Sequence, residues 1–212
     1  MSIADLLEHK RERSNRMYGV VVGVVTNNKD EDGLGRVKVK IPRLSGDDES
    51  HWARVVSFMA GKERGAFFLP EVDDEVLVAF EHGDLALPYV IGALWNGTDV
   101  PPETNSDGEN NVRVIQSRSG HIIRLNDKEG EETIEITDKT EKNSIVISTK
   151  DNKITITSDK DIELSAKNGK ISLDAKDVEI KSSAGTKLEA SADLDLKASG
   201  NNTIKGATVN IN

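Results

Sequence analysis

Three short segments of this 212-residue chain contain residue types that could do chemistry. Glu81-His82-Gly83-Asp84 sets an imidazole among carboxylates, a combination that suits general acid–base catalysis. Asp73-Asp74-Glu75 offers the oxygen ligands that hard divalent cations prefer. Gly33-Leu34-Gly35 has the glycine content of a phosphate-binding loop. These segments are the candidates for an enzyme active site.

The elements expected around these segments favour structural roles for all three. Glu81–Asp84 falls between strands predicted at 75–80 and 88–94, so it reads as a hairpin turn. Asp73–Glu75 lacks the alternating spacing of an EF-hand loop, and Gly33–Gly35 precedes a strand rather than a helix. The chain has no cysteine, which excludes thiolate chemistry, disulfides and cysteine-based zinc sites. We therefore expect no catalytic residue, no metal and no cofactor.

Residues 18–96 have the pattern of a small antiparallel β barrel. Glycine and proline separate strands expected at 18–26, 36–41, 52–58, 75–80 and 88–94. Val37, Val39 and Ile41 alternate with lysines, which predicts an inward apolar face. All eight aromatic residues of the chain lie here, and we expect most of them to point into the core. Five short strands in this length fit a barrel of the OB type.

Residues 112–212 form a ladder of short aliphatic pairs that contains neither an aromatic residue nor a proline. The i, i+2 spacing puts both members of a pair on one face of a strand, and such a strand buries that face only when repeats stack. An interior of aliphatic branches alone favours three chains wound around one axis over a broad single-chain β-helix. The expected core of this homotrimer is Ile134, Ile136, Ile145, Ile147, Ile154, Ile156, Ile162, Leu164, Ile171, Leu173, Val178, Ile180, Leu194, Leu196, Val209 and Ile211.

The remaining segments connect or flank these two regions. Residues 1–17 predict a short helical arm whose Ile3, Leu6 and Leu7 share a face for docking on a neighbouring protein. Residues 97–111 are polar, contain two prolines and two glycines, and predict a linker. The net charge of −9, most of it in the first half of the chain, disfavours a nucleic-acid partner. Without the pattern of a secretory signal, synthesis is expected in the cytoplasm.

The sequence thus predicts an all-β fold, with an N-terminal OB-fold barrel (18–96) followed by a C-terminal intertwined triple-stranded β-helix (112–212). Four stretches of the barrel segment, at 33–39, 50–55, 65–80 and 81–92, occur in the order of a known family. Because of these four stretches, residues 18–103 resemble the OB-fold domain of the phage baseplate assembly protein V and VgrG spike family. The resemblance implies a homotrimeric central spike, a membrane-puncturing needle in the baseplate of a phage or a phage-derived injection particle.

The resemblance also implies partners. VgrG proteins carry a hub domain ahead of the barrel, and only 17 residues precede it here, so a separate tail hub protein is expected, with Ile3, Leu6 and Leu7 as its contacts. Some phage spikes end in an iron-binding His-x-His tip. The last residues here contain no histidine, so we expect no tip metal but a separate PAAR-type tip protein on Val209, Asn210, Ile211 and Asn212. Other baseplate proteins and, transiently, the target membrane complete the partners. The alternative is a trimeric β-helical tail fibre or adhesin that binds a cell-surface receptor.

Overall fold

The structure is a computed structural model that describes residues 16–44 and 48–210. The chain divides into two units, Met1–Lys160 and Asp161–Asn212. The helical arm expected at 1–17, with its hub contacts Ile3, Leu6 and Leu7, lies outside the described residues up to residue 15. Ile211 and Asn212, expected in the core and at the tip contact, lie outside them as well.

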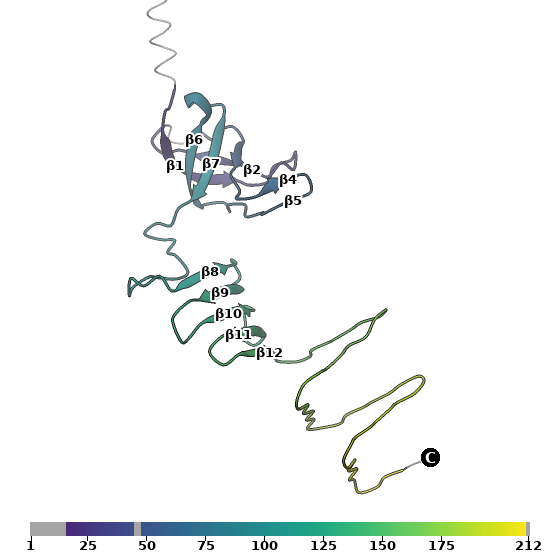
Figure 1. The fold of residues 1–212 in the computed structure, drawn as a ribbon. Helices are drawn as coiled ribbons and strands as arrows, with labels where there is room; N and C mark the ends of the chain where they lie inside the picture. Colours follow the sequence, from purple (N-terminus) through teal and green to yellow (C-terminus); the bar gives the residue numbers. More distant parts are fainter. Residues whose placement is uncertain (1–15, 45–47, 211–212) are drawn as a thin grey trace, which may run out of the picture. The chain divides into compact units, whose positions relative to one another are not determined.

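The first unit begins with a closed β barrel (Figure 1). Its strands are β1 (Val20–Asn27), β2 (Arg36–Lys40), β3 (Ala53–Val55), β6 (Glu75–Phe80) and β7 (Pro88–Ala93). They close in the order β1-β2-β3-β7-β6, in which β3 and β7 are parallel and the other neighbours are antiparallel. A single 3₁₀ turn, η1 (Glu81–Gly83), joins β6 to β7. The N-terminal barrel predicted from the sequence is confirmed.

Valine fills the barrel core. Val25, Val37, Val39, Val76 and Val78 are completely buried, as the alternation along β2 and β6 predicts. The prediction that most aromatic residues point inward is wrong. Among the described residues, Phe80 is the aromatic side chain that reaches the buried core, because the other aromatic residues lie outside the barrel strands or, like Tyr89, alternate with the inward positions of a strand.

A short hairpin that the sequence did not predict leaves the barrel between β3 and β6. It consists of β4 (Ala60–Gly61) and β5 (Arg64–Gly65), two residues each, paired antiparallel. Much of the aromatic content of the chain lies at the base of this hairpin, outside the barrel.

The first unit ends in a five-stranded antiparallel sheet. Its strands are β8 (Val112–Gln116), β9 (Ile122–Asn126), β10 (Thr133–Thr137), β11 (Ser144–Ser148) and β12 (Lys153–Thr157). Each strand pairs with the next, so the sheet runs in the order β8 to β12 (Figure 1). The predicted intertwined trimer would form its strand-to-strand hydrogen bonds between chains. In the structure, the hydrogen bonds among β8 to β12 lie within one chain. Connections of four to six residues are short enough to return the chain antiparallel beside itself.

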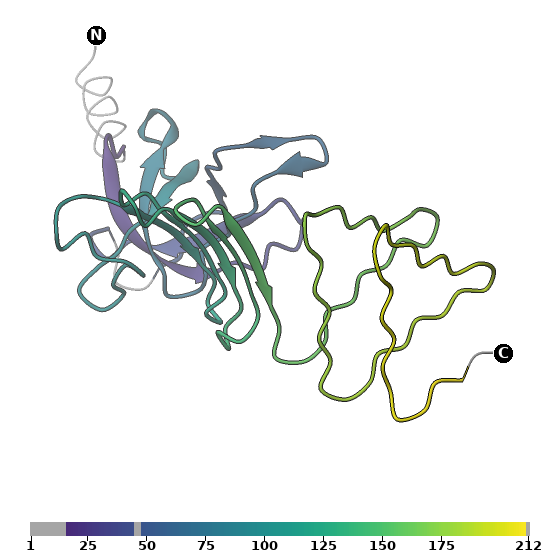
Figure 2. The ribbon, with the colours of Figure 1, turned by 60° about the horizontal axis from the view of Figure 1, so that its bottom comes forward.

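The second unit forms no strand among its described residues, 161–210. The backbone instead runs in extended stretches joined by corners (Figure 2). Turns or bends fall at 167–169, Lys176, 183–184, 191–192, 199–200 and Ala207, at intervals of about eight residues. The corners of the backbone therefore recur along the unit together with its aliphatic residues.

Candidate interaction surfaces

One face of the β8–β12 sheet is a continuous aliphatic surface. Residues directly opposite each other across a ladder share a face of the sheet, and the observed register lines up two columns on this face. The aliphatic face, as we call it, consists of Ile115, Ile123, Ile136, Ile145 and Ile156 in one column and of Leu125, Ile134, Ile147 and Ile154 in the other.

The aliphatic face is bare in the single chain. Its side chains are exposed, from 38 % at Ile147 to 66 % at Ile154. The opposite face of the sheet, with Glu135, Val146 and Thr155 at its centre, is the more covered of the two. Water-exposed apolar surfaces of this continuity mark sites of association. The sheet is therefore built to be covered on its apolar side.

The turn between β10 and β11 fixes the register that aligns the columns. The Asp138 carboxylate accepts hydrogen bonds from the Thr140 hydroxyl and the Asn143 side-chain amide, both at 2.9 Å. The Asn143 bond, with smaller contributions from Thr140, lowers the pKa of Asp138 to about 2. This ionised anchor sets the turn so that Ile136 lies opposite Ile145. A shift by one residue would move every isoleucine to the other face.

Aliphatic residues of the second unit recur at a fixed distance in sequence from its bends. Leu188 and Ile204, like Ile180 and Leu196, stand four residues after a bend, so the four recur at intervals of eight. All the expected core residues of this unit that the structure describes are exposed in the single chain: Ile162, Leu164, Ile171, Leu173, Val178, Ile180, Leu194, Leu196 and Val209. Their regular placement predicts one apolar side along the whole unit.

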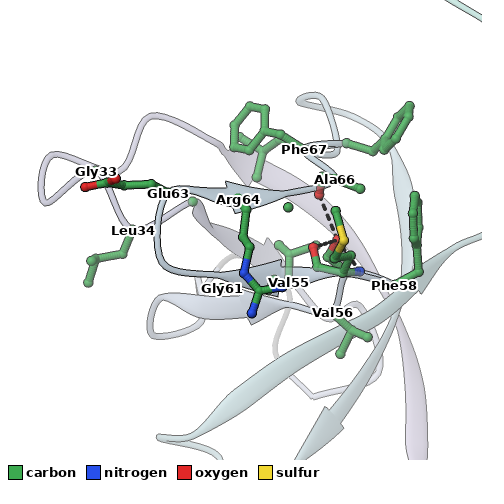
Figure 3. Close-up of a pocket in the computed structure, with 17 residues that line it drawn as sticks. Gly33, Leu34, Val55, Val56, Phe58, Gly61, Glu63, Arg64, Ala66 and Phe67 are labelled. Atoms are coloured by element: carbon green, nitrogen blue, oxygen red, sulfur yellow. Dashed lines mark hydrogen bonds between the residues drawn. The ribbon is translucent and has the colours of Figure 1, made fainter.

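A second apolar surface lies at the base of the β4–β5 hairpin (Figure 3). It surrounds a hollow of ≈ 620 Å³ whose lining includes the Gly33–Gly35 loop and the hairpin itself. The aromatic patch, as we call it, consists of Leu34, Val56, Phe58, Met59, Phe67 and Phe68, all exposed. Phe58 is 85 % exposed, and its ring lies 6.3 Å from that of Phe68.

Hydrogen bonds and a glycine hold the hairpin in shape. The Ser57 hydroxyl donates to the carbonyl oxygens of Ala66 at 2.7 Å and of Met59 at 3.1 Å, and the Ala66 amide donates to the Met59 carbonyl at 2.9 Å (Figure 3). A Cβ atom at Gly65 would lie 2.8 Å from the Met59 carbonyl oxygen, closer than real side chains approach. The patch is thus displayed on a defined scaffold.

The loop that carries Leu34 is organised around one carboxylate. Asp30 accepts hydrogen bonds from the Leu34 amide and from Arg36, whose Nε and Nη2 lie 2.8 and 2.7 Å from its oxygens. The Asp30 side chain is 4 % exposed. The bond from Arg36 is the main cause that holds the pKa of Asp30 well below its ordinary value. Gly33 and Gly35 both adopt a φ of 67°, which glycine permits without strain.

We expect Asp30→Asn to lower the unfolding temperature of the barrel at pH 7, because the amide cannot replace the ion pair with Arg36. The folded-state pKa of Asp30 is depressed, so its contribution is complete above the unfolded pKa, about 3.9, and fades as the pH falls below that value. Thermal unfolding of both proteins between pH 7 and pH 2.5 should show their difference shrinking below about pH 4. Asp32→Asn, at an exposed partner of Arg36, is the control with a smaller effect. A difference independent of pH would contradict this role.

The residues considered for chemistry take structural roles. Glu81–Gly83 is the predicted turn between β6 and β7, and the Glu81 carboxylate accepts a hydrogen bond from the Tyr89 hydroxyl. The Asp74 carboxylate accepts a hydrogen bond from the Glu71 amide at the entrance of β6. Among the residues that the structure describes, no group of three or more His, Asp or Glu could hold a metal ion, and no helix is long and apolar enough to cross a bilayer.

The structure brings together the core residues expected in the sheet and adds others. Ile134, Ile136, Ile145, Ile147, Ile154 and Ile156 share one face, as their spacing predicts. Ile115, Ile123 and Leu125 belong to the same columns but were not among the expected core residues, although Ile123 and Leu125 have the same i, i+2 spacing. Leu188 and Ile204 have no aliphatic partner two residues away, but their spacing of eight from Ile180 and Leu196 was visible in the sequence.

Comparison with known proteins assigns the barrel to a class. Residues 21–95 match the family described as the type VI secretion system/phage-baseplate injector OB domain. The barrel segment is thus similar to injector OB domains, and the resemblance predicted from the sequence is confirmed. The chain is related to VgrG-type baseplate and spike proteins.

Individual relatives give the extent of this relationship. The chain is 36 % identical over 141 residues to the type VI secretion system spike protein VgrG5 of Pseudomonas aeruginosa, a match that covers 60 % of this chain and 18 % of the relative. It is 31 % identical over 126 residues to the spike protein VgrG3 of Vibrio cholerae, which covers 56 % and 12 %. The actin cross-linking toxin VgrG1 of V. cholerae is 36 % identical over 92 residues, covering 42 % and 8 %. The chain thus spans a small part of these relatives.

Proposed function

We propose that this chain is the structural central spike of a contractile phage tail or a phage-derived injection system, the needle that connects the tail hub to the tip and punctures a membrane. The observation that carries the proposal is the exposed aliphatic face, which follows the segment that matches the injector OB domain after a polar connection. The fold supports a mechanical role, because the residues that were considered as catalytic or metal-binding candidates form turns and strand ends. The spike acts as a stiff body rather than as an enzyme.

Three copies close around one axis in this proposal. Each chain presents one aliphatic face, and three such faces turned toward an axis bury one another completely in a closed symmetric assembly. The side chains on this face are isoleucine and leucine, which suit a narrow interior. The relationship to VgrG-type proteins supports self-association. The trimer, not the single chain, is the functional unit.

The second unit extends the same assembly. Its extended stretches belong to no sheet among the described residues, yet backbone N–H and C=O groups next to apolar side chains require partners. Three copies wound around one axis, with corners every eight residues, supply those partners from neighbouring chains. The core of this intertwined needle consists of Ile162, Leu164, Ile171, Leu173, Val178, Ile180, Leu194, Leu196, Val209 and Ile211, with Leu188 and Ile204 added by their spacing.

The mechanism is the transmission of force. Axial load is shared by many ladder hydrogen bonds in parallel, and sheath contraction drives the needle through the target envelope. A separate hub protein holds the barrel end, with Ile3, Leu6 and Leu7 as contacts, and other baseplate proteins surround it. A PAAR-type tip protein covers the other end at Val209–Asn212. The net charge of −9 argues against nucleic acid as a partner.

Placement within the particle tests this function. A gold-binding tag at the barrel end, viewed by electron microscopy in purified injection particles, should mark the particle axis, and quantitative mass spectrometry should count three copies per particle. Labels at the periphery in several multiples of three would reject the spike and favour a tail fibre or adhesin.

A further inference from the structure

The aromatic patch is a large apolar surface of the barrel that the proposed needle does not use. Phe58, Phe67 and Phe68 are each more than 60 % exposed, although aromatic side chains are among the most favourable to bury. Ser57 and Gly65 hold the hairpin that displays them. An exposed apolar surface held in a defined shape is typical of a site that another molecule or another copy binds.

The aromatic patch is continuous with the aliphatic face. Phe67 and Phe68 line a second hollow, of ≈ 800 Å³, together with Ile115, Ile123, Ile136, Ile145 and Ile156, which form one complete column of the aliphatic face. An ion pair of 2.6 Å between Arg118, after β8, and Glu71 of the barrel lies at the same place. Two of the aromatic rings therefore border the same apolar hollow as the isoleucines.

Resting on the proposed function, we propose that the aromatic patch is the barrel's share of the interface between copies, and that its occupant is a second copy of this chain. A surface that borders the aliphatic face is turned to the same neighbour when that face closes around an axis. The hairpin tip carries both signs of charge, at Lys62, Glu63 and Arg64. A symmetric assembly can therefore place opposite charges of neighbouring hairpins side by side. The barrels thus contact each other through the aromatic patch, so both the barrels and the needle contribute to the interface between copies.

The chain has no cysteine, so a single introduced thiol reports on this surface without background. The complete chain carrying Phe58→Cys is purified, its mass is measured by light scattering, and its reaction with a maleimide is followed. In the purified protein, protection of this thiol that is lost when the copies dissociate comes from another copy. We expect the thiol to react about tenfold more slowly in the trimer than in the same variant dissociated by Ile145→Asp, since thiol reactivity requires access. Met59→Cys repeats the measurement with both phenylalanine rings in place.

Leu87→Cys is the matched control. Leu87 is exposed on the barrel beside η1 and does not line the patch, so its thiol should react equally fast in both states. A trimer in which the thiols at positions 58 and 59 react as fast as in dissociated chains overturns the inference and leaves the patch open for a different protein. A single-chain mass before Ile145→Asp is introduced overturns the proposed trimer and this inference together, so the two failures are distinct.

Discussion

Ile145→Asp is expected to leave the protein as single chains at concentrations where the unsubstituted chain is a trimer. Ile145 lies within the aliphatic face, between Ile136 and Ile156 in its column. The substitution removes an isoleucine from a shared interior and brings three carboxylates toward one axis. The loss of burial and the desolvation of each charge cost about 3–5 kcal/mol per copy. Light scattering behind a sizing column measures the outcome directly.

Thr155→Asp is the matched control for this substitution. Thr155 lies near Ile145 in the neighbouring strand but on the opposite face of the sheet, where it pairs with Val146. We expect the control to keep the trimer mass, because the new carboxylate lies on the face that the proposed interface between copies does not use. Equal masses for the two variants would contradict the assignment of the aliphatic face as the interface.

The second large effect is expected from Ile171→Asp in the second unit. Ile171 and Leu173 occupy one extended stretch between the bends at Asn168 and Lys176. In an intertwined needle the substitution places three carboxylates around the axis, each at a cost of several kcal/mol. We expect the second unit to lose resistance to SDS and to proteases, while the β8–β12 sheet keeps its own strand pairing because its ladders lie within one chain.

Ser172→Asp is the control in the same stretch. Ser172 stands between Ile171 and Leu173, so its side chain points to the other side of an extended backbone. The control should retain the SDS resistance of the unsubstituted protein on gels of unboiled samples. Wild-type resistance in Ile171→Asp would mean that the aliphatic residues of the second unit do not face a shared interior.

The barrel was largely predictable because its strands alternate in a simple way. Val37 and Val39 in β2, and Val76, Val78 and Phe80 in β6, are buried at the positions that period-2 patterning indicates. The prediction that most aromatic residues lie in the barrel core was wrong, because hydrophobicity alone does not distinguish a side chain inside a barrel from one on a hairpin beside it. The β4–β5 hairpin has two residues per strand, too few for any periodicity to be read.

The aliphatic face was predictable as a set of residues but not as a pairing. The i, i+2 spacing indicates which side chains share a face, and Ile134, Ile136, Ile145 and Ile147 do. Spacing says nothing about whether the neighbouring strand comes from the same chain. That choice depends on the turns, such as the one that Asp138 anchors before β11. The sequence therefore predicted the surface, while the antiparallel sheet within one chain emerged from the structure.

The most direct test of the central claim is the mass of the purified, complete chain in solution, measured by light scattering behind a sizing column. We expect three times the chain mass of 23.1 kDa, with a hydrodynamic radius larger than that of a sphere of that mass. A compact particle with the mass of one chain would contradict it, because the aliphatic face would then remain in water.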